Sequence, residues 1–254
     1  RVINSVINSE ELSSKEIDTV TCQLLNEGEN IFTLNENNLK NANPELIISQ
    51  ETCEVCAAYT NQVNKAVQIL QKKPEIFSMD PHNMDEIVES VIKLGKIIDK
   101  EEKAKEISNK LLKRIENIRK NQNKKKIKVL AIEWIEPFFT AGHWVPEMIE
   151  IAGGINLISK TGEHSRRLYI AEVVKSNPDI IIMMPCGFDT HRTIKECDGF
   201  LKNKKEWNNL EAVKKNQVFA VDANSFFSKP SIRTIESIEI LAKIIQPEIF
   251  INLV

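Results

Sequence analysis

NPDIIIMM, residues 177–184, and NPELIISQ, residues 43–50, are two forms of one pattern. Each opens with Asn-Pro and continues into a short apolar run, which is typical of a buried strand. Each also follows an amphipathic segment, residues 170–175 in the first case and 34–42 in the second. A helix that leads through Asn-Pro into a strand is part of an α/β unit, and the chain carries this part twice.

The two copies continue alike beyond these strands. FSMD at residues 77–80 and FAVD at residues 219–222 each end a further apolar run in aspartate. The full order is helix, strand, loop, helix and strand, so the repetition predicts two similar α/β lobes with parallel sheets. Because parallel sheets bind ligands beyond the carboxyl ends of their strands, we expect a site in the loops that follow them.

The region between the two copies is helical by pattern. Asn83 is placed to cap a helix, and the apolar residues after it recur at helical spacing. A second helical pattern passes into a basic run at 120–128, which contains no aromatic residue and is therefore interpreted as a solvated boundary. We expect a long linker helix at 101–126, between an N-terminal lobe, 1–100, and a C-terminal lobe, 127–254.

Composition argues against several classes of protein. The 254 residues carry 34 basic and 36 acidic groups, a net charge of −2, which is unlike a nucleic-acid-binding protein. Glycine occurs only eight times, and neither standard glycine-rich phosphate loop is present. No apolar run approaches the length of a membrane-spanning helix, about 20 residues. Five cysteines are an odd count, so they do not make a complete disulfide framework, and the compartment stays open.

An aromatic loop follows the strand that begins the second lobe. Residues 133–147 read EWIEPFFTAGHWVPE, a heavy aromatic load for a chain that is only 6% aromatic. Flat rings suit a broad, partly apolar ligand, although the same rings could instead pad the junction between sheet and helix. His143 is a site candidate, with a hydrogen-bonded structural histidine as the alternative. The candidate rings are Trp134, Phe138, Phe139 and Trp144.

Two further aromatic positions extend this hypothesis. Phe226 and Phe227 form a second aromatic loop just after the strand that ends at Asp222. Phe32 precedes the first copied unit and would be the matching ring of the opposite lobe. All three are candidate ligand contacts.

The cysteines offer a separate, thiol-based chemistry. Cys53 and Cys56 form a C-x-x-C after a strand, a spacing used by redox pairs and by half of a zinc site. Cys186 and His143 could supply the missing zinc ligands, and an inert structural thiol pair is the alternative. No Ser/His/Asp ordering or paired acid and base stands out, so we expect a protein that is not an enzyme.

Taken together, four motifs resemble a known family. They are EWIEPFFTAGHWVPEMIEIAGG, PDIIIMMPCGF, PELIISQETCEVCA and FFSKPSIR, which occur in the family's order over nearly the whole chain. They resemble the cobalamin-binding substrate-binding proteins of ABC importers. The resemblance implies an α/β fold of two Rossmann-like lobes joined by one long, rigid α-helix, with the corrinoid in a cleft between the lobes.

The resemblance also implies roles for particular residues. Ring contacts to the corrinoid fall on Phe139 and on the Phe226-Phe227 loop, and Phe32 sits where the family's first lobe offers an aromatic residue. Family members dock on the transporter through one acidic residue in each lobe, which fits Glu36 and Glu172. Ordinary carboxylates at helix N-termini are the alternative for these two. The family usually opens with a further strand and helix, so we expect the first lobe to lack them.

The resemblance therefore implies a monomeric substrate-binding protein that holds cobalamin or a related corrinoid as its ligand and delivers it to the membrane subunits of an ABC importer. No catalytic cofactor and no nucleic acid are expected. Family resemblance favours an extracytoplasmic location, either periplasmic or membrane-anchored, with a cytoplasmic one as the alternative. A siderophore, haem or metal-ion binder of the same fold and a thiol-redox protein using Cys53 and Cys56 are the alternative functions.

Overall fold

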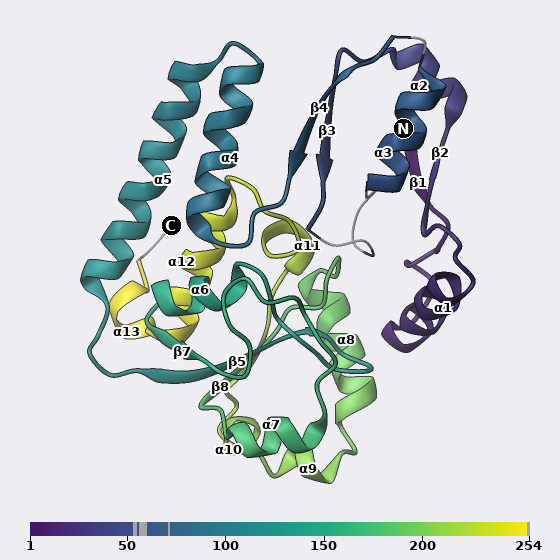
Figure 1. The fold of residues 1–254 in the computed structure, drawn as a ribbon. Coiled ribbons are helices and arrows are strands. Elements are labelled where there is room, and N and C mark those ends of the chain that lie inside the picture. Colours follow the sequence, from purple (N-terminus) through teal and green to yellow (C-terminus); the bar gives the residue numbers. More distant parts are fainter. Residues whose placement is uncertain (53–54, 56–59, 71, 253–254) are drawn as a thin grey trace. The chain divides into compact units, whose positions relative to one another are not determined.

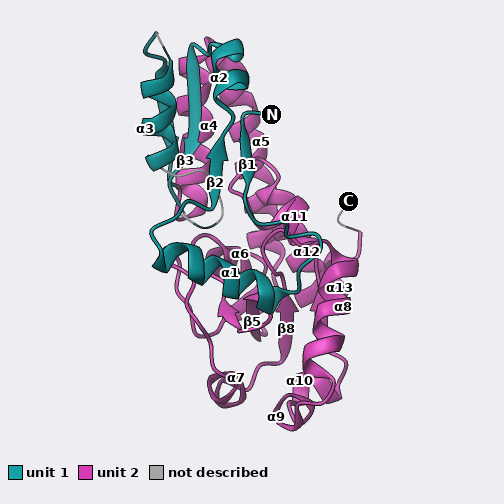
Figure 2. Ribbon diagram, turned by 90° about the vertical axis from the view of Figure 1, so that its right-hand side faces the viewer, with its two compact units in different colours: residues 1–80 teal, residues 81–254 magenta. Residues whose placement is uncertain are grey.

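The computed structural model describes residues 1–52, 55, 60–70 and 72–252 of the chain. The fold is mixed α/β, as predicted. The chain divides into two compact units, unit 1 at Arg1–Asp80 and unit 2 at Pro81–Val254 (Figure 2). Each unit contains parallel strand pairs and helices of its own, so each is described by itself.

Unit 1 holds two small sheets. Strands β1 and β2 pair antiparallel, and β3 and β4 pair parallel with Leu46 opposite Glu75. Its elements are β1 (Ile3–Ser5), α1 (Ser14–Asn26), β2 (Phe32–Leu34), α2 (Glu36–Ala42), β3 (Leu46–Gln50), α3 (Thr60–Ile69) and β4 (Glu75–Met79).

The expectation that the first lobe lacks the family's opening strand and helix stays a prediction. Strand β1 and helix α1 both precede β2. Helix α1 has a strong local start, because the Glu16 amide donates to Ser13 Oγ and the Ser13 amide donates to Glu16 Oε2 at 2.8 Å.

Unit 2 is built on one five-stranded sheet. The strand order is β6-β5-β8-β9, with β7 paired to the other part of β5, and every pairing except β5–β6 is parallel. Its elements are α4 (Met84–Ile97), α5 (Glu101–Asn121), β5 (Ile127–Trp134), β6 (Phe139–Thr140), α6 (Val145–Ile151), β7 (Gly154–Asn156), α7 (Ile170–Ser176), β8 (Ile180–Met183), α8 (Thr190–Leu201), α9 (Lys205–Asn208), α10 (Glu211–Lys214), β9 (Val218–Ala220), α11 (Ala223–Phe226), α12 (Thr234–Ile245) and α13 (Pro247–Phe250).

The two copied stretches adopt the same local structure. Helices α2 and α7 each end at an asparagine in the left-handed region, Asn43 with φ 38° and Asn177 with φ 43°. Asparagine tolerates this conformation better than other residues with a side chain, and the proline after it cannot continue a helix. The strands that follow, β3 and β8, each pair in parallel with the next copied strand. The predicted duplication is confirmed at the level of helix, turn and parallel strand pair.

The helix expected as a linker begins at Glu101 and ends at Asn121. It runs back along α4 as one arm of a helical hairpin (Figure 1). Gly95 permits the close approach of the two helices, because a Cβ there would lie 2.3 Å from the Cβ of Ala104. Because α4 packs on α5 and α5 packs on α12, all three belong to unit 2, and the unit boundary lies at Asp80 instead of residue 100.

The sheet of unit 2 is buried on both faces. Alternate residues of β5 and β8 enter two separate clusters: Val129, Ala131, Ile180 and Ile182 enter one, and Leu130, Ile132, Ile181 and Met183 enter the other. The first cluster also holds residues of α4, α5, α6 and α12, and the second holds residues of α7, α8 and α9. Unit 2 is therefore a three-layer α/β/α arrangement, which leaves the strand ends as the places where loops meet.

Candidate functional site

The loops at the carboxyl ends of β5, β8 and β9 are bonded into one surface of unit 2. The Cys186 amide, after β8, donates to the Glu133 carbonyl of β5 at 3.0 Å. The Gly187 amide donates to Ser228 Oγ at 2.9 Å, and the Asn224 amide donates to the Phe188 carbonyl at 3.1 Å. These bonds hold loops from three neighbouring strands together at the edge where α/β sheets bind ligands.

A row of aromatic rings follows this edge. Trp134 and Phe139 are partners across the β5–β6 pair, so their side chains lie on the same face of the sheet. The Trp134 ring lies 5.2 Å from the Phe188 ring, measured between centroids. Phe226 follows on α11, whose chain is bonded to Phe188 through Asn224. Trp134, Phe139 and Phe226 are partly exposed, whereas Phe188 is buried beneath the row.

Arginine side chains lie over two rings of this row and over Phe188 beneath it. Arg192 lies over Phe188 with its guanidinium carbon 3.7 Å from the ring centroid. Arg233 lies over Phe226 at 4.5 Å, and Arg167 lies near the face of Phe139 at 5.7 Å. Sequence reasoning missed Phe188 and all three arginines. The Phe188 and Arg192 spacing of four residues was the one local signal that pointed to such a pair.

Three of the predicted ligand-contacting rings are buried in hydrophobic clusters. Phe138 is 5% exposed and packs on Phe200 and Trp207, with centroids 5.7 and 5.8 Å away. Trp144 and Phe227 are 4% and 3% exposed and belong to the cluster on the other face of the sheet. These three rings match the alternative interpretation, in which aromatic residues pad the junction between sheet and helix.

Phe32 lies in unit 1, in the short strand β2. It is half-buried and pairs with Ser5 of β1. Its role as a ligand contact stays a prediction.

His143 lies in a cluster of three histidines. Its ring centroid is 5.1 Å from that of His164 and 6.0 Å from that of His82, and His82 and His164 are 6.0 Å apart. Residues 82, 143 and 164 share no sequence spacing, so only the fold reveals this cluster. Among the described residues, no three His, Cys, Asp or Glu side chains are placed to hold a metal ion.

The loop that carries His164 is bonded along the aromatic loop. The His143 amide donates to the Glu163 carbonyl at 2.7 Å, and the Gly162 amide donates to the His143 carbonyl at 2.9 Å. Gly142 allows this approach, because a Cβ there would lie 2.6 Å from the Glu163 carbonyl oxygen and 2.7 Å from the Ser165 amide nitrogen. Backbone hydrogen bonds to residues 162–168 therefore hold the aromatic loop in place.

Glu133 ties the same two segments to β5. Its carboxylate accepts hydrogen bonds from Ser165 Oγ and, at 3.3 Å, from the Gly142 amide. Burial raises the pKa of the Glu133 carboxyl group, and the hydrogen bonds from Ser165 and Gly142 act in the opposite direction. This residue stabilises the loop beneath the site.

The two predicted docking carboxylates, Glu36 and Glu172, lie in the first turns of α2 and α7, the corresponding helices of the two copies. Glu172 pairs with Arg166 at 2.8 Å and accepts a hydrogen bond from the Tyr169 amide at 3.0 Å. The hydrogen bond from Arg166 lowers the pKa of Glu172. Glu36 opens α2 and is exposed, with Lys40 at 3.9 Å on the next turn. Glu172 also serves its own helix start, as the alternative interpretation requires.

The hypothesis of a thiol-redox or zinc site depends mainly on two cysteines that the structure does not describe. Cys53 and Cys56 lie outside the described residues. Cys186 is half-buried at the carboxyl edge, in the loop after β8. The thiol-redox and zinc alternatives therefore stay predictions.

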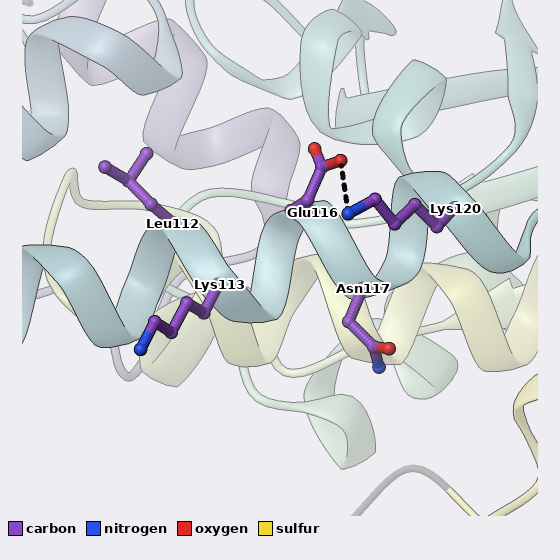
Figure 3. Close-up of a pocket in the computed structure, with 5 residues that line it drawn as sticks. All are labelled: Leu112, Lys113, Glu116, Asn117 and Lys120. Atoms are coloured by element: carbon purple, nitrogen blue, oxygen red, sulfur yellow. Dashed lines mark ion pairs between the residues drawn. The ribbon is translucent and has the colours of Figure 1, made fainter.

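An open hollow on α5 offers no comparable chemistry. Its five lining residues, Leu112, Lys113, Glu116, Asn117 and Lys120, all come from this one helix (Figure 3). Lys120 pairs with Glu116 at 3.2 Å, along the helix surface. Side chains of a single helix face do not converge on a ligand, so the carboxyl edge is the better candidate site.

Comparison with known proteins identifies the family to which this chain belongs. The chain belongs to the periplasmic binding protein family, whose model matches residues 27–225. This family is made of solute-binding proteins, which are non-enzymatic components of transport. No helix among the described residues is long and apolar enough to cross a membrane.

One curated relative is a heme uptake protein. The chain is 27% identical over 143 residues to the high-affinity heme uptake system protein IsdE of Staphylococcus aureus (strain MRSA252). That match covers 54% of this chain and 48% of the relative, so the chain spans about half the length of the curated relative.

Solved structures share the fold over most of the chain. An ABC transporter substrate-binding protein from Listeria monocytogenes EGD-e has a TM-score of 0.72 at 21% identity, covering 84% of this chain and 81% of that one. Staphylococcus aureus IsdE complexed with heme has a TM-score of 0.69 at 20% identity, with 84% and 81% covered. The periplasmic vitamin B12 binding protein BtuF of Vibrio cholerae has a TM-score of 0.63 at 21% identity, with 85% and 79% covered.

Proposed function

We propose that this chain is the substrate-binding protein of an ABC importer and that its ligand is cobalamin or a related corrinoid. The row of partly exposed rings at the carboxyl edge of unit 2, Trp134, Phe139 and Phe226, supports this proposal. A corrinoid is broad and partly apolar, and rings in a row offer it contact area at a low cost in side-chain entropy. An extracytoplasmic location, periplasmic or membrane-anchored, is part of the proposal.

Rigid support of the row is the second argument. The loops beneath the rings are held by the bonds of Cys186, Gly187 and Asn224 and by the Glu133–Ser165 contact. A surface that is ordered before the ligand arrives loses little binding free energy to ordering on association. The fold likeness to the vitamin B12 binding protein of Vibrio cholerae agrees with this ligand class.

Haem is the second candidate ligand. It is also a broad metal-containing ring, and the curated relative from Staphylococcus aureus is a heme uptake protein. The fold likeness to the heme complex of IsdE points the same way.

Ligand titration tests the proposal. Cobalamin, and in parallel haem, is added while tryptophan fluorescence and the melting temperature are followed. Trp134 lies in the row, so binding should quench its fluorescence and raise the melting temperature. If neither ligand produces either change, the proposal is wrong.

A pair of aromatic variants locates the ligand. Phe139→Ala removes a ring of the row and should weaken binding about tenfold, the loss of one well-packed aromatic contact. Tyr169→Ala is the matched control, because Tyr169 is 70% exposed and lies outside the row at the start of α7. Equal affinities of the two variants would place the ligand elsewhere.

Charge reversal tests the importer contact. Glu36→Lys and Glu172→Lys should weaken association with the importer while ligand affinity stays the same, as expected of docking carboxylates. Glu150→Lys, at an exposed carboxylate of α6, is the control that should change neither quantity. If the first two variants lose ligand affinity instead, their carboxylates belong to the ligand site.

A further inference from the structure

Strand β3 of unit 1 has a neighbouring strand on one edge only. Among the described residues it pairs with β4, whereas β8, its copy in unit 2, lies between β5 and β9. The two copies keep the same register, because Ile48 stands opposite Phe77 and its equivalent, Ile182, stands opposite Phe219. Strand β4 therefore corresponds to β9, and no strand in the described part of unit 1 corresponds to β5.

An apolar groove lies along the open edge of β3. Its volume is about 280 Å³, and residues 46–49 of β3 form part of its lining. Because successive residues of a strand point to opposite faces, contact with all four places the groove at the edge of the strand. Residues 46–49 are the equivalents of residues 180–183, which are the four that pair with β5 in unit 2. The groove therefore occupies the position that β5 fills in the other unit.

The other walls of the groove are also mainly apolar. They include Val2 and Ile3 at β1, Leu34 at the end of β2, Leu39 of α2 and Val63 of α3. Water in such a groove finds few of the polar partners that it needs. Aliphatic side chains are the occupants that this lining favours.

The backbone edge of β3 distinguishes between apolar occupants. Alternate residues of a strand direct their N–H and C=O groups to the same edge. In unit 2 the Met184 amide donates to the Ile132 carbonyl of β5 at 2.8 Å, and Gln50 is the equivalent of Met184. Gln50 and Ile48 therefore direct their backbone groups toward the groove. A hydrocarbon chain cannot form hydrogen bonds with these groups, whereas an extended peptide can.

We propose that unit 1 binds an extended apolar peptide of a partner chain in this groove, as a strand parallel to β3. In this mode of recognition, main-chain hydrogen bonds give affinity and alternate side chains give specificity. The parallel direction follows from β5, which runs parallel to β8. The partner is a different chain, because the described strands of a second copy are already paired in their own sheets. This site goes beyond the proposed function, whose aromatic row belongs to unit 2.

Strand β5 supplies the probe peptide. A synthetic peptide with the sequence of residues 127–134, IKVLAIEW, carries a fluorophore at its N-terminus and is titrated with the protein. The change in anisotropy gives the dissociation constant. The control peptide carries Ala131→Pro, which removes an N–H group and is not accommodated in the middle of a sheet. The unaltered peptide should bind at least about tenfold more tightly than the control.

Hydrogen exchange locates the bound peptide. The amides of Ile48 and Gln50 should exchange at least about tenfold more slowly in the complex, because they become hydrogen-bonded to the added strand. The amides of β8 should exchange as they do in the free protein. Neither cobalamin nor haem is present in these measurements, so their result does not depend on the proposed function.

Two variants at one position test the edge itself. Ile48→Pro removes an N–H group that faces the groove, while bonds on the other edge remain, such as that from the Glu51 amide to the Met79 carbonyl at 2.9 Å. Ile48→Ala is the matched control, because it keeps the N–H group. The alanine variant should bind the peptide about tenfold more tightly than the proline variant. Thermal melting followed by circular dichroism shows whether both variants fold.

Three outcomes overturn the inference. The first is the absence of binding at peptide concentrations up to about 1 mM. The second is equal affinity of the two peptides for the wild-type protein, a comparison that stands even if the proline variant does not fold. The third is protection of amides outside β3 without protection of β3 itself. Equal peptide affinity of folded Ile48→Pro and Ile48→Ala would likewise exclude strand addition at this edge.

Discussion

The two copied strands share a backbone but differ in burial. Strand β8 is buried at every position between β5 and β9, whereas β3 pairs with β4 and has Ile48 52% exposed. Ile48 and Ile182 occupy the same position after Asn-Pro in the two copies. The turn and strand are therefore local properties of the repeated sequence, while burial depends on how many strands and helices the rest of the unit supplies.

The largest expected difference lies at these matched isoleucines. Ile182→Ala should reduce the free energy of unfolding of unit 2 by about 3–4 kcal/mol, because it opens a cavity in a fully buried strand. Ile48→Ala should cost less than about 1 kcal/mol, because its side chain is half-exposed. Urea unfolding reports on unit 2 through tryptophan fluorescence, since all three tryptophans, Trp134, Trp144 and Trp207, lie there.

Hydrogen exchange of the β3 and β4 amides reports on unit 1. Similar losses in the two copies would contradict the difference in burial.

Ion pairs provide the next contrast. Arg114 of α5 donates two hydrogen bonds to Glu239 of α12, at 2.8 and 2.6 Å, and the Glu239 side chain is only 7% exposed. Arg114→Ala leaves this carboxylate buried without its partner and should cost about 2 kcal/mol, reduced from a fully buried pair because Arg114 itself is partly exposed. Chemical denaturation of unit 2 measures the loss.

Two further variants sharpen this result. Lys72→Ala removes an exposed pair of unit 1 with Glu45, at 3.4 Å, and should leave hydrogen exchange of β3 unchanged. The double variant Arg114→Met, Glu239→Leu should recover most of the stability, because no charge then remains buried. A double variant as unstable as Arg114→Ala would show that packing, not charge, accounts for the loss.

The Asn-Pro turns should behave alike in the two units. Asn43→Ala and Asn177→Ala each place alanine in the left-handed region and should each cost about 1 kcal/mol, whereas the glycine variants should lose almost nothing. The measurements are those used for the matched isoleucines. Unequal losses would mean that the turn geometry is imposed by each unit's packing and is not a property of the repeated motif.

The last prediction concerns the pH dependence of stability that the carboxylate beneath the site causes. Burial raises the pKa of Glu133 above its ordinary value of 4.5, so the fold favours the protonated form. The favourable contribution is complete below pH 4.5 and is lost as the pH rises through the raised pKa. Glu133→Gln stays neutral, so its stability relative to wild type should increase as the pH rises from 4 to 8.

The melting temperature of wild type and variant as a function of pH measures this difference. Glu150→Gln, at an exposed carboxylate of α6, is the control that should follow the wild-type curve. A stability difference that is constant with pH would exclude titration of Glu133 as its cause.

Local sequence determined much of this fold. Asn-Pro after an amphipathic segment placed the helix ends at Asn43 and Asn177, and Asn83 caps α4 as predicted, with its side chain accepting from the Glu86 amide at 2.9 Å. The aromatic loop was correctly placed at the carboxyl end of β5. These features depend on φ preferences, caps and apolar spacing over a few residues, which are properties of short segments.

Only the tertiary structure decided which side chains the site presents. Phe138 and Phe139 are neighbours in sequence, yet one is packed under Phe200 and Trp207 and the other lies at the exposed edge. The His82, His143 and His164 cluster and the contact of Arg167 with Phe139 join residues from distant parts of the chain. Periodicity shows that a face is apolar, but burial and ring–arginine contacts depend on partners that reach that face only when the sheet has assembled.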